Sequence, residues 1–158
     1  MRVYSNDFND GDKMPERQVF NGMGYQGDNI SPHLAWDDAP EGTKSFVVTC
    51  YDPDAPTGSG WWHWVVVNIP ASTQLLEQGA GSGLAMLPPG ALQTRTDFGK
   101  AGYGGAAPPQ GKSHRYIFTV HALDVEAIEV DAEASGAMVG FNVHFHALAS
   151  ASITVNYS

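Results

Sequence analysis

Three runs of β-branched and aromatic residues, separated by stretches rich in glycine and proline, restrict this chain to a fold built mainly from β-strands. The runs are residues 45–51, 64–69 and 114–123, each bounded by turn-forming residues. The continuous apolar stretch 65–67 predicts a strand that is covered on both faces. Eighteen glycines and ten prolines, scattered without a period, favour many turns between short elements over a helix bundle.

Helix is predicted only late in the chain. Asp131 can cap a helix, and apolar residues follow at helical spacing at Met138, Phe141 and Phe145. Phe145 is expected to lie in the core. Residues 152–157 alternate in polarity and predict a final strand.

Length and charge limit the function classes. A chain of 158 residues fits a single domain, residues 1–158. A net charge of −9 without a basic stripe argues against nucleic acid and against an anionic membrane surface as partners. We find neither a signal peptide nor a membrane-spanning stretch, so we expect a cytoplasmic protein with no membrane insertion. Cys50 is the only cysteine and is expected to be a small buried apolar residue.

The first segment whose side chains could form a functional site is residues 52–56, Asp-Pro-Asp-Ala-Pro. It is followed by His63 within a tryptophan-rich strand. The two prolines stiffen the backbone where a strand ends. Asp52 and Asp54 near an imidazole make a candidate site. An alternative is that both carboxylates accept hydrogen bonds from turn amides while the tryptophans fill the core.

The second segment is residues 102–111, a loop rich in glycine and proline, followed by His114 and Tyr116. Such a loop can present backbone N–H groups to an anion, because glycine permits close approach. His114 opens a strand beside the loop and could donate to the same anion.

Three other chemistries find less support. A site of two histidines and one carboxylate is conceivable, but no helical pair of histidines and no cysteine pair accompanies it, so we expect no metal and no cofactor. The Gly-x-Ser-x-Gly spacing of a serine hydrolase is missing. The phosphate-binding Gly-x-x-x-x-Gly-Lys-Ser/Thr loop is missing as well.

Together, these segments resemble the phosphatidylethanolamine-binding (Raf kinase inhibitor-like) family. The resemblance rests on residues 52–56, on 61–65 with Asn68, and on 102–116. Residues 29–36, 42–46 and 93–98 resemble its bacterial branch, the YbhB/YbcL type. The resemblance covers nearly the whole chain. It implies two antiparallel sheets in a Greek-key β-sandwich with short C-terminal helices.

The resemblance also implies a pocket at one end of the sandwich for phosphate, acetate-like ions or a phospholipid head group. Carried over residue by residue, its ligand-binding positions are Asp52, Asp54, His63, Ala107, Pro108, Pro109, His114 and Tyr116. Many relatives read Gly-Gly-Pro ahead of the proline pair, whereas this chain has Gly-Ala-Ala at 105–107, which affects the pocket rim. The aromatic residue at the pocket edge in animal relatives has no obvious match in residues 57–60.

We therefore hypothesise that the chain is a binding protein for a small anionic or phosphate-bearing ligand, and that ligand binding could serve a regulatory role. A hydrolase or isomerase using a His–Asp pair is one alternative. An inhibitor of a kinase or protease is the other. An ionised Asp52 would repel the anion, so we expect Asp52 to orient and charge a histidine, with His63 as a charged donor.

Two structural expectations follow. We expect at least one cis X–Pro bond among four crowded prolines, Pro53, Pro56, Pro108 and Pro109, since tight strand ends are where such bonds occur. We also expect a homodimer, since the tryptophan-rich segment could leave apolar surface exposed.

Overall fold

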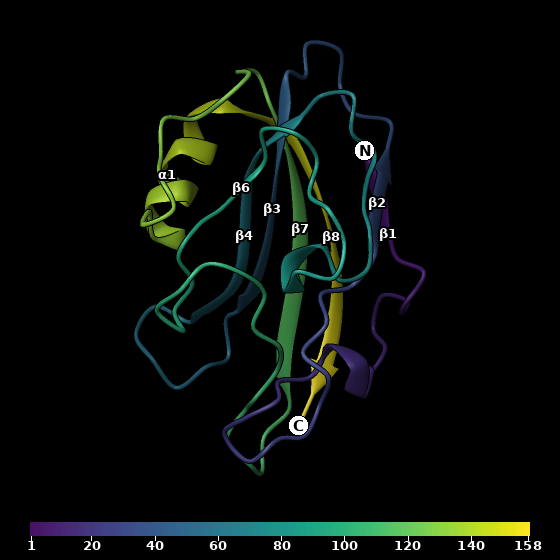
Figure 1. Ribbon diagram of the computed structural model, residues 1–158, viewed down its shortest axis with the longest axis vertical. Helices are drawn as coiled ribbons and strands as arrows, with labels where there is room; N and C mark the ends of the chain where they lie inside the picture. The colour runs from purple at the N-terminus through teal and green to yellow at the C-terminus, as the bar shows by residue number, and fades with distance from the viewer.

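Two antiparallel sheets pack face to face in the computed structural model of this protein, which describes residues 1–158 (Figure 1). The larger sheet has five strands, in the spatial order β6 (Leu92–Gln93), β4 (Trp61–Pro70), β3 (Ser45–Asp52), β7 (His114–Leu123) and β8 (Ala147–Tyr157). The smaller sheet has three strands, β1 (Arg2–Tyr4), β2 (Leu34–Asp37) and β5 (Leu75–Leu76). One α-helix, α1 (Gly136–His146), and two 3₁₀ turns, η1 (Glu16–Gln18) and η2 (Ala80–Ser82), complete the fold.

The larger sheet contains a Greek key. β3, β4 and β6 follow one another within this sheet and are neighbours in space, with β5 of the smaller sheet between β4 and β6 in the chain. The chain then crosses the end of the sheet to add β7 beside β3. This topology confirms the predicted Greek-key sandwich. The crossing connection, residues 94–113, contains the loop that is rich in glycine and proline. It therefore runs past the ends of β3, β4 and β7.

The larger sheet is covered on both faces, as the stretch 65–67 predicts. Val66 belongs to the main core of 21 buried residues, which lies between the two sheets. Val65 and Val67 point the other way, into a second core of seven buried residues under α1. In Figure 1, α1 and the smaller sheet accordingly lie on opposite sides of the larger sheet.

The predicted strands are confirmed, with differences at their ends. The third run matches β7 at both ends, and its even-numbered residues from 114 to 122 are buried. β4 begins at Trp61, three residues before the prediction, and β8 begins at Ala147, five residues before it. The short strands β1 and β2 were not predicted, because runs of three or four residues carry too little periodicity to be recognised.

The predicted start of the C-terminal helix is wrong. Asp131 accepts a hydrogen bond from the backbone of Glu133 and forms a local turn, whereas α1 begins at Gly136 and is capped by Ser135. A Cβ atom on Gly136 would lie 2.4 Å from the ring of Trp62, so only glycine lets the helix start this close to β4.

The expected core position of Phe145 is also wrong. Its side chain is 63% exposed, and Phe141 and Met138 lie on the same outer face of α1. The inner face consists of small residues, because the helix packs close to the sheet; these residues are Gly136, Val139 and Val143. Trp64 is fully buried and its two tryptophan neighbours are half-buried, so the tryptophan-rich segment is not where the exposed apolar side chains lie.

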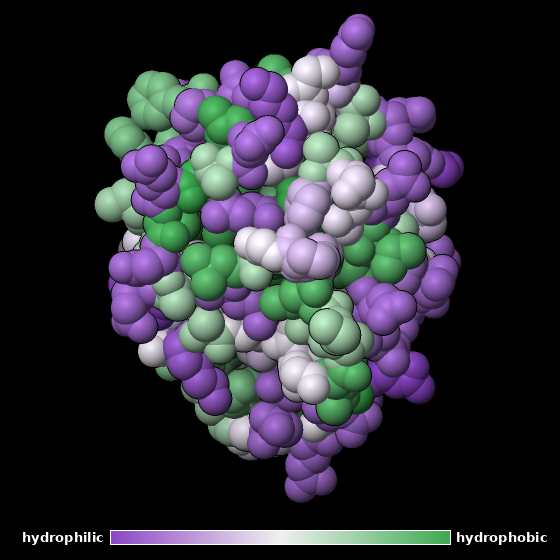
Figure 2. Space-filling model, turned by 45° about the horizontal axis from the view of Figure 1, so that its top comes forward, coloured by the Kyte–Doolittle hydropathy of each residue, from purple (hydrophilic) through white to green (hydrophobic).

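All X–Pro bonds are trans, so the expected cis bond is absent. The trans form is favoured even before proline, and the turns after β3 and before β7 close with trans geometry. Cys50 is free and buried, as expected. No helix has the length and apolar character needed to cross a membrane. On the face shown in Figure 2, hydrophobic residues form small groups between hydrophilic ones.

The cap of α1 gives a first prediction. The Ser135 hydroxyl accepts a hydrogen bond from the backbone N–H of Met138 at 3.1 Å. Ser135→Ala should lower the free energy of unfolding by about 1 kcal/mol, because it leaves an N-terminal helix amide without its partner. Urea denaturation measures the loss. Ser135→Asp, which retains a capping acceptor, should stay close to the parent; equal losses in both variants would contradict the capping role.

Candidate functional site

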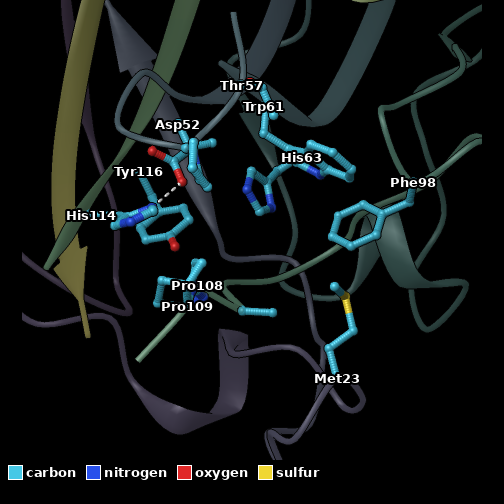
Figure 3. Close-up of a pocket in the computed structure, with 13 residues that line it drawn as sticks. Met23, Asp52, Thr57, Trp61, His63, Phe98, Pro108, Pro109, His114 and Tyr116 are labelled. Atoms are coloured by element: carbon cyan, nitrogen blue, oxygen red, sulfur yellow. Dashed lines mark hydrogen bonds and ion pairs between the residues drawn. The ribbon is translucent and has the colours of Figure 1, made fainter. Parts of the chain in front are cut away.

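A cavity of about 190 Å³ lies where β3 ends and where β4 and β7 begin. Figure 3 shows the labelled side chains of its wall arranged around a common space. Thirteen residues line it: Met23, Asp52, Ala55, Pro56, Thr57, Trp61, His63, Phe98, Ala107, Pro108, Pro109, His114 and Tyr116. The fold thus brings together the two segments that sequence analysis singled out.

Asp52 and His114 form a buried pair at one side of the cavity. Asp52 is the last residue of β3 and His114 is the first of β7, and both side chains are almost fully buried. Asp52 Oδ2 lies 2.8 Å from Nδ1 of His114, the contact drawn as a dashed line in Figure 3. Its other oxygen accepts the backbone N–H of Asp54 at 2.7 Å. Asp52 therefore holds both the turn amide and the imidazole.

His63 stands on β4 and is held by the glycine-rich loop. Its Nδ1 lies 2.8 Å from the carbonyl oxygen of Gly104. Burial lowers the pKa of His63, and this effect outweighs the Gly104 and Gly105 carbonyls and the charge of Asp52, which act in the opposite direction. Unlike the charged donor expected from the sequence, His63 is therefore neutral near pH 7 without a ligand.

These contacts determine what each imidazole offers to the cavity. A carbonyl and a carboxylate only accept hydrogen bonds, so Nδ1 carries the hydrogen in both rings. Nε2 of each ring has no protein partner and is not sealed from solvent. Neutral His63 thus presents a lone pair to the cavity.

The Tyr116 hydroxyl is a donor in the same cavity. Burial, together with the nearby charge of Asp52, raises the pKa of this phenol well above its ordinary value. Its side chain is buried, and the hydroxyl points into the common space in Figure 3. Tyr116 therefore keeps its proton and can donate to an anion.

Side chains from the N-terminal segment position the loop at the cavity edge. Asn29 accepts the backbone N–H of Gly105 at 2.7 Å, and Tyr25 donates its hydroxyl hydrogen to the carbonyl of Pro108. Gly105 has no room for a side chain, because a Cβ atom there would lie 2.1 Å from the carbonyl oxygen of Gln18. Hydrogen bonds thus hold the loop on both sides of Ala106 and Ala107, at Gly105 and at Pro108. The loop therefore keeps its place at the cavity edge with Gly-Ala-Ala at 105–107.

Asp54 is the one predicted site residue that does not line the cavity. Its carboxylate receives three hydrogen bonds from Arg115, one from the backbone and two from the guanidinium, each at 2.9 Å. Arg115 lowers the pKa of Asp54 from 3.8 to about 2. Because side chains alternate along β7, Arg115 faces away from His114 and Tyr116 and draws Asp54 with it.

The structure adds lining residues that sequence analysis missed. Trp61 and Phe98 supply aromatic side chains at the rim, and Met23, Ala55, Pro56 and Thr57 complete the wall. Trp61 directly follows residues 57–60, the stretch in which an aromatic residue at the pocket edge was expected. Its place at the start of a strand whose third residue is His63 was a usable signal. Met23 lies in a loop far from either segment and carried no such signal. Phe98 closes the stretch 93–98, which supported the family resemblance without pointing to the cavity.

No cluster of three or more histidine, cysteine or acidic side chains is arranged to hold a metal ion. Asp52 and His114 instead contact each other, and His63 contacts a backbone carbonyl.

The fold and the cavity define a class of β-sandwich proteins with a small pocket at the strand ends. The family model for phosphatidylethanolamine-binding protein matches residues 4–158. The chain belongs to the phosphatidylethanolamine-binding protein family.

Individual relatives are similar over nearly their full length. The chain is 77% identical to the UPF0098 protein YbhB of Escherichia coli over 158 residues, which cover all of both chains. It is 53% identical to the UPF0098 protein YbcL of the same organism, covering 99% of this chain and 86% of that one.

Two solved structures have the same fold. The crystal structure of Escherichia coli YbcL, described as a new member of the mammalian PEBP family, gives a TM-score of 0.96 at 52% identity, covering 99% of this chain and 97% of that chain. A putative phosphatidylethanolamine-binding protein homologue from Chlamydia trachomatis gives 0.83 at 28% identity, covering 99% and 96%.

The Asp54–Arg115 pair gives a second prediction. Because the folded state lowers the pKa of Asp54, the pair contributes stability above pH 3.8, and this contribution is lost as pH falls toward 2. Asp54→Asn should therefore be slightly less stable than the parent at pH 7, and the difference should narrow as pH falls from 3.8 through about 2. Thermal unfolding at several pH values measures the difference. A gap between the two proteins that stayed constant over this range would contradict the assignment.

Proposed function

We propose that this protein binds a small anionic, phosphate-bearing ligand in the cavity formed by Asp52, His63, His114 and Tyr116. The observation that carries the proposal is the buried Asp52–His114 pair beside the free Nε2 atoms of two imidazoles. No lysine or arginine lines the cavity. Among the four side chains named above, the donors available to an anion are therefore the Tyr116 hydroxyl and whichever imidazole carries a second proton.

His114 is the imidazole that faces a carboxylate. Asp52 Oδ2 lies 2.8 Å from its Nδ1, so a second proton on this ring would place a positive charge directly beside a negative one. Protonated His114 and Asp52 together carry no net charge. This offsets the repulsion between Asp52 and a bound anion, about 4 kcal/mol for unit charges 4 Å apart in a surface-like dielectric. We therefore assign donation to a bound dianion to this buried pair.

His63 takes a different part in this proposal. Its Nε2 lone pair accepts a hydrogen bond, which suits an anion that carries its own proton, such as hydrogen phosphate. The groups facing His63 are the Gly104 and Gly105 carbonyls and the charges of Asp52 and Asp97. Phe98 and Tyr116 contribute ring edges.

Binding is favoured over catalysis by the hydroxyl groups of the cavity. Tyr116 has a raised pKa and is therefore a poor nucleophile. The Thr57 hydroxyl donates to the carbonyl of Gly60 at 2.6 Å, so it is not paired with an imidazole that could activate it. Neither hydroxyl has the nucleophile–base geometry of a hydrolase.

The third prediction separates the two histidines. His114→Asn removes the charge-assisted donor and should weaken sulfate and phosphate binding roughly ten- to a hundredfold. His63→Asn should weaken phosphate more than sulfate, because only phosphate brings a proton for Nε2 to accept. Isothermal titration calorimetry measures both affinities, and thermal unfolding checks that each variant is folded.

Sulfate also tests the pH dependence, since it stays a dianion throughout the accessible range. Its affinity for the wild type should fall as pH rises, because an imidazole whose Nδ1 carries a hydrogen donates from Nε2 only when it holds a second proton. Titrations in buffers of different ionisation enthalpy should report proton uptake. In folded His114→Asn or Asp52→Asn protein this dependence should be reduced. Sulfate affinity that is independent of pH in the wild type would reject the protonated donor.

A further inference from the structure

The cavity wall has two chemically different halves. The polar half consists of Asp52, His63, His114 and Tyr116. The other half consists of residues with mainly apolar side chains: Met23, Trp61, Phe98, Pro108 and Pro109. In Figure 3, Phe98 and Met23 lie across the space from the Asp52–His114 pair. A free phosphate ion could satisfy only the polar half.

The aromatic side of this apolar half is rigid. Phe98 stacks on Phe20 with ring centroids 4.8 Å apart and meets the ring of Trp61 edge to face at 5.5 Å. It also contacts the ring of His63 at 5.4 Å. Phe98 therefore presents a fixed hydrophobic surface directly beside an imidazole of the anion site.

Met23 is held over the cavity by a strained turn. The backbone N–H of Tyr25 donates to Gly22, and Met23 and Gly24 between them both have positive φ angles, 54° and 90°. The left-handed conformation disfavours a residue with a long side chain, and glycine or asparagine usually occupies it. Strain of this kind gathers at ligand-binding segments. Met23 is also 70% exposed, so a ligand could cover it.

We infer that the cavity takes a phosphate monoester whose ester group is apolar, aromatic or short aliphatic, and that Met23 and Phe98 determine this specificity. The inference rests on the proposed anion site. An apolar group beside the phosphate buries side chains that otherwise face water. A sugar group would place hydroxyls against Met23 and Phe98, which offer no hydrogen-bond partners. The flexible thioether of Met23 adapts to ester groups of different shape.

The test compares three probes: inorganic phosphate, phenyl phosphate and O-phosphoethanolamine. The wild type should bind phenyl phosphate roughly tenfold or more tightly than inorganic phosphate, because of the additional apolar burial. Met23→Asn should lose most of this preference. Asparagine tolerates positive φ, so the turn should fold. Met86→Asn is the matched control, since Met86 is 89% exposed and lies outside the cavity. Calorimetric titration provides the affinities.

The outcomes separate the inference from the proposed function. Equal binding of phenyl phosphate and inorganic phosphate would overturn the apolar preference and leave the anion site standing. Tighter binding of O-phosphoethanolamine than of phenyl phosphate would overturn it as well, and would point to an ammonium group over Trp61. Failure of all three probes to bind would overturn both proposals. A preference unchanged in both Met23→Asn and Phe98→Leu would reject these residues as its source.

Discussion

The antiparallel pairing of β3 with β7 is the constraint on which the site depends. It runs from Ser45 opposite Leu123 to Tyr51 opposite Ile117, so the end of β3 meets the beginning of β7. This register brings Asp52 to His114 across 62 residues of sequence. A shift by one residue would turn His114 to the other face of the sheet, because side chains alternate along a strand. The backbone pairing thus determines which carboxylate meets which imidazole.

The proposed anion site lies in an acidic protein and contains no lysine or arginine. Its selectivity for an anion would come from local geometry: a carbonyl at His63 and a carboxylate at His114 determine the positions of the hydrogens on both rings. The long-range field of a chain with net charge −9 opposes anions and is screened by salt beyond about 10 Å. Close, buried contacts are screened far less, so they can dominate recognition.

Helix α1 illustrates how a correct periodicity can be assigned to the wrong face. Phe141 and Phe145 recur at helical spacing, yet they face solvent. The inner face uses Gly136, Val139 and Val143 because the helix packs closely against Trp62 and the sheet. A sequence pattern reports which residues share a face, and it does not report how much space the partner leaves.

The sequence by itself determined the β-rich class, the central strands and most of the polar half of the cavity. β-branched runs, the stiff Asp-Pro-Asp-Ala-Pro segment and the loop rich in glycine and proline each leave a local signal. Tertiary structure decided the rest. It moved Asp54 out of the cavity, since Arg115 lies on the opposite face of β7. It brought Met23 and Phe98 into the cavity wall from loops that nothing in the sequence linked to the site. The physical reason is that a cavity between strand ends is lined by whichever loops the sheet topology carries past it, and side-chain alternation then selects the residues that face inward.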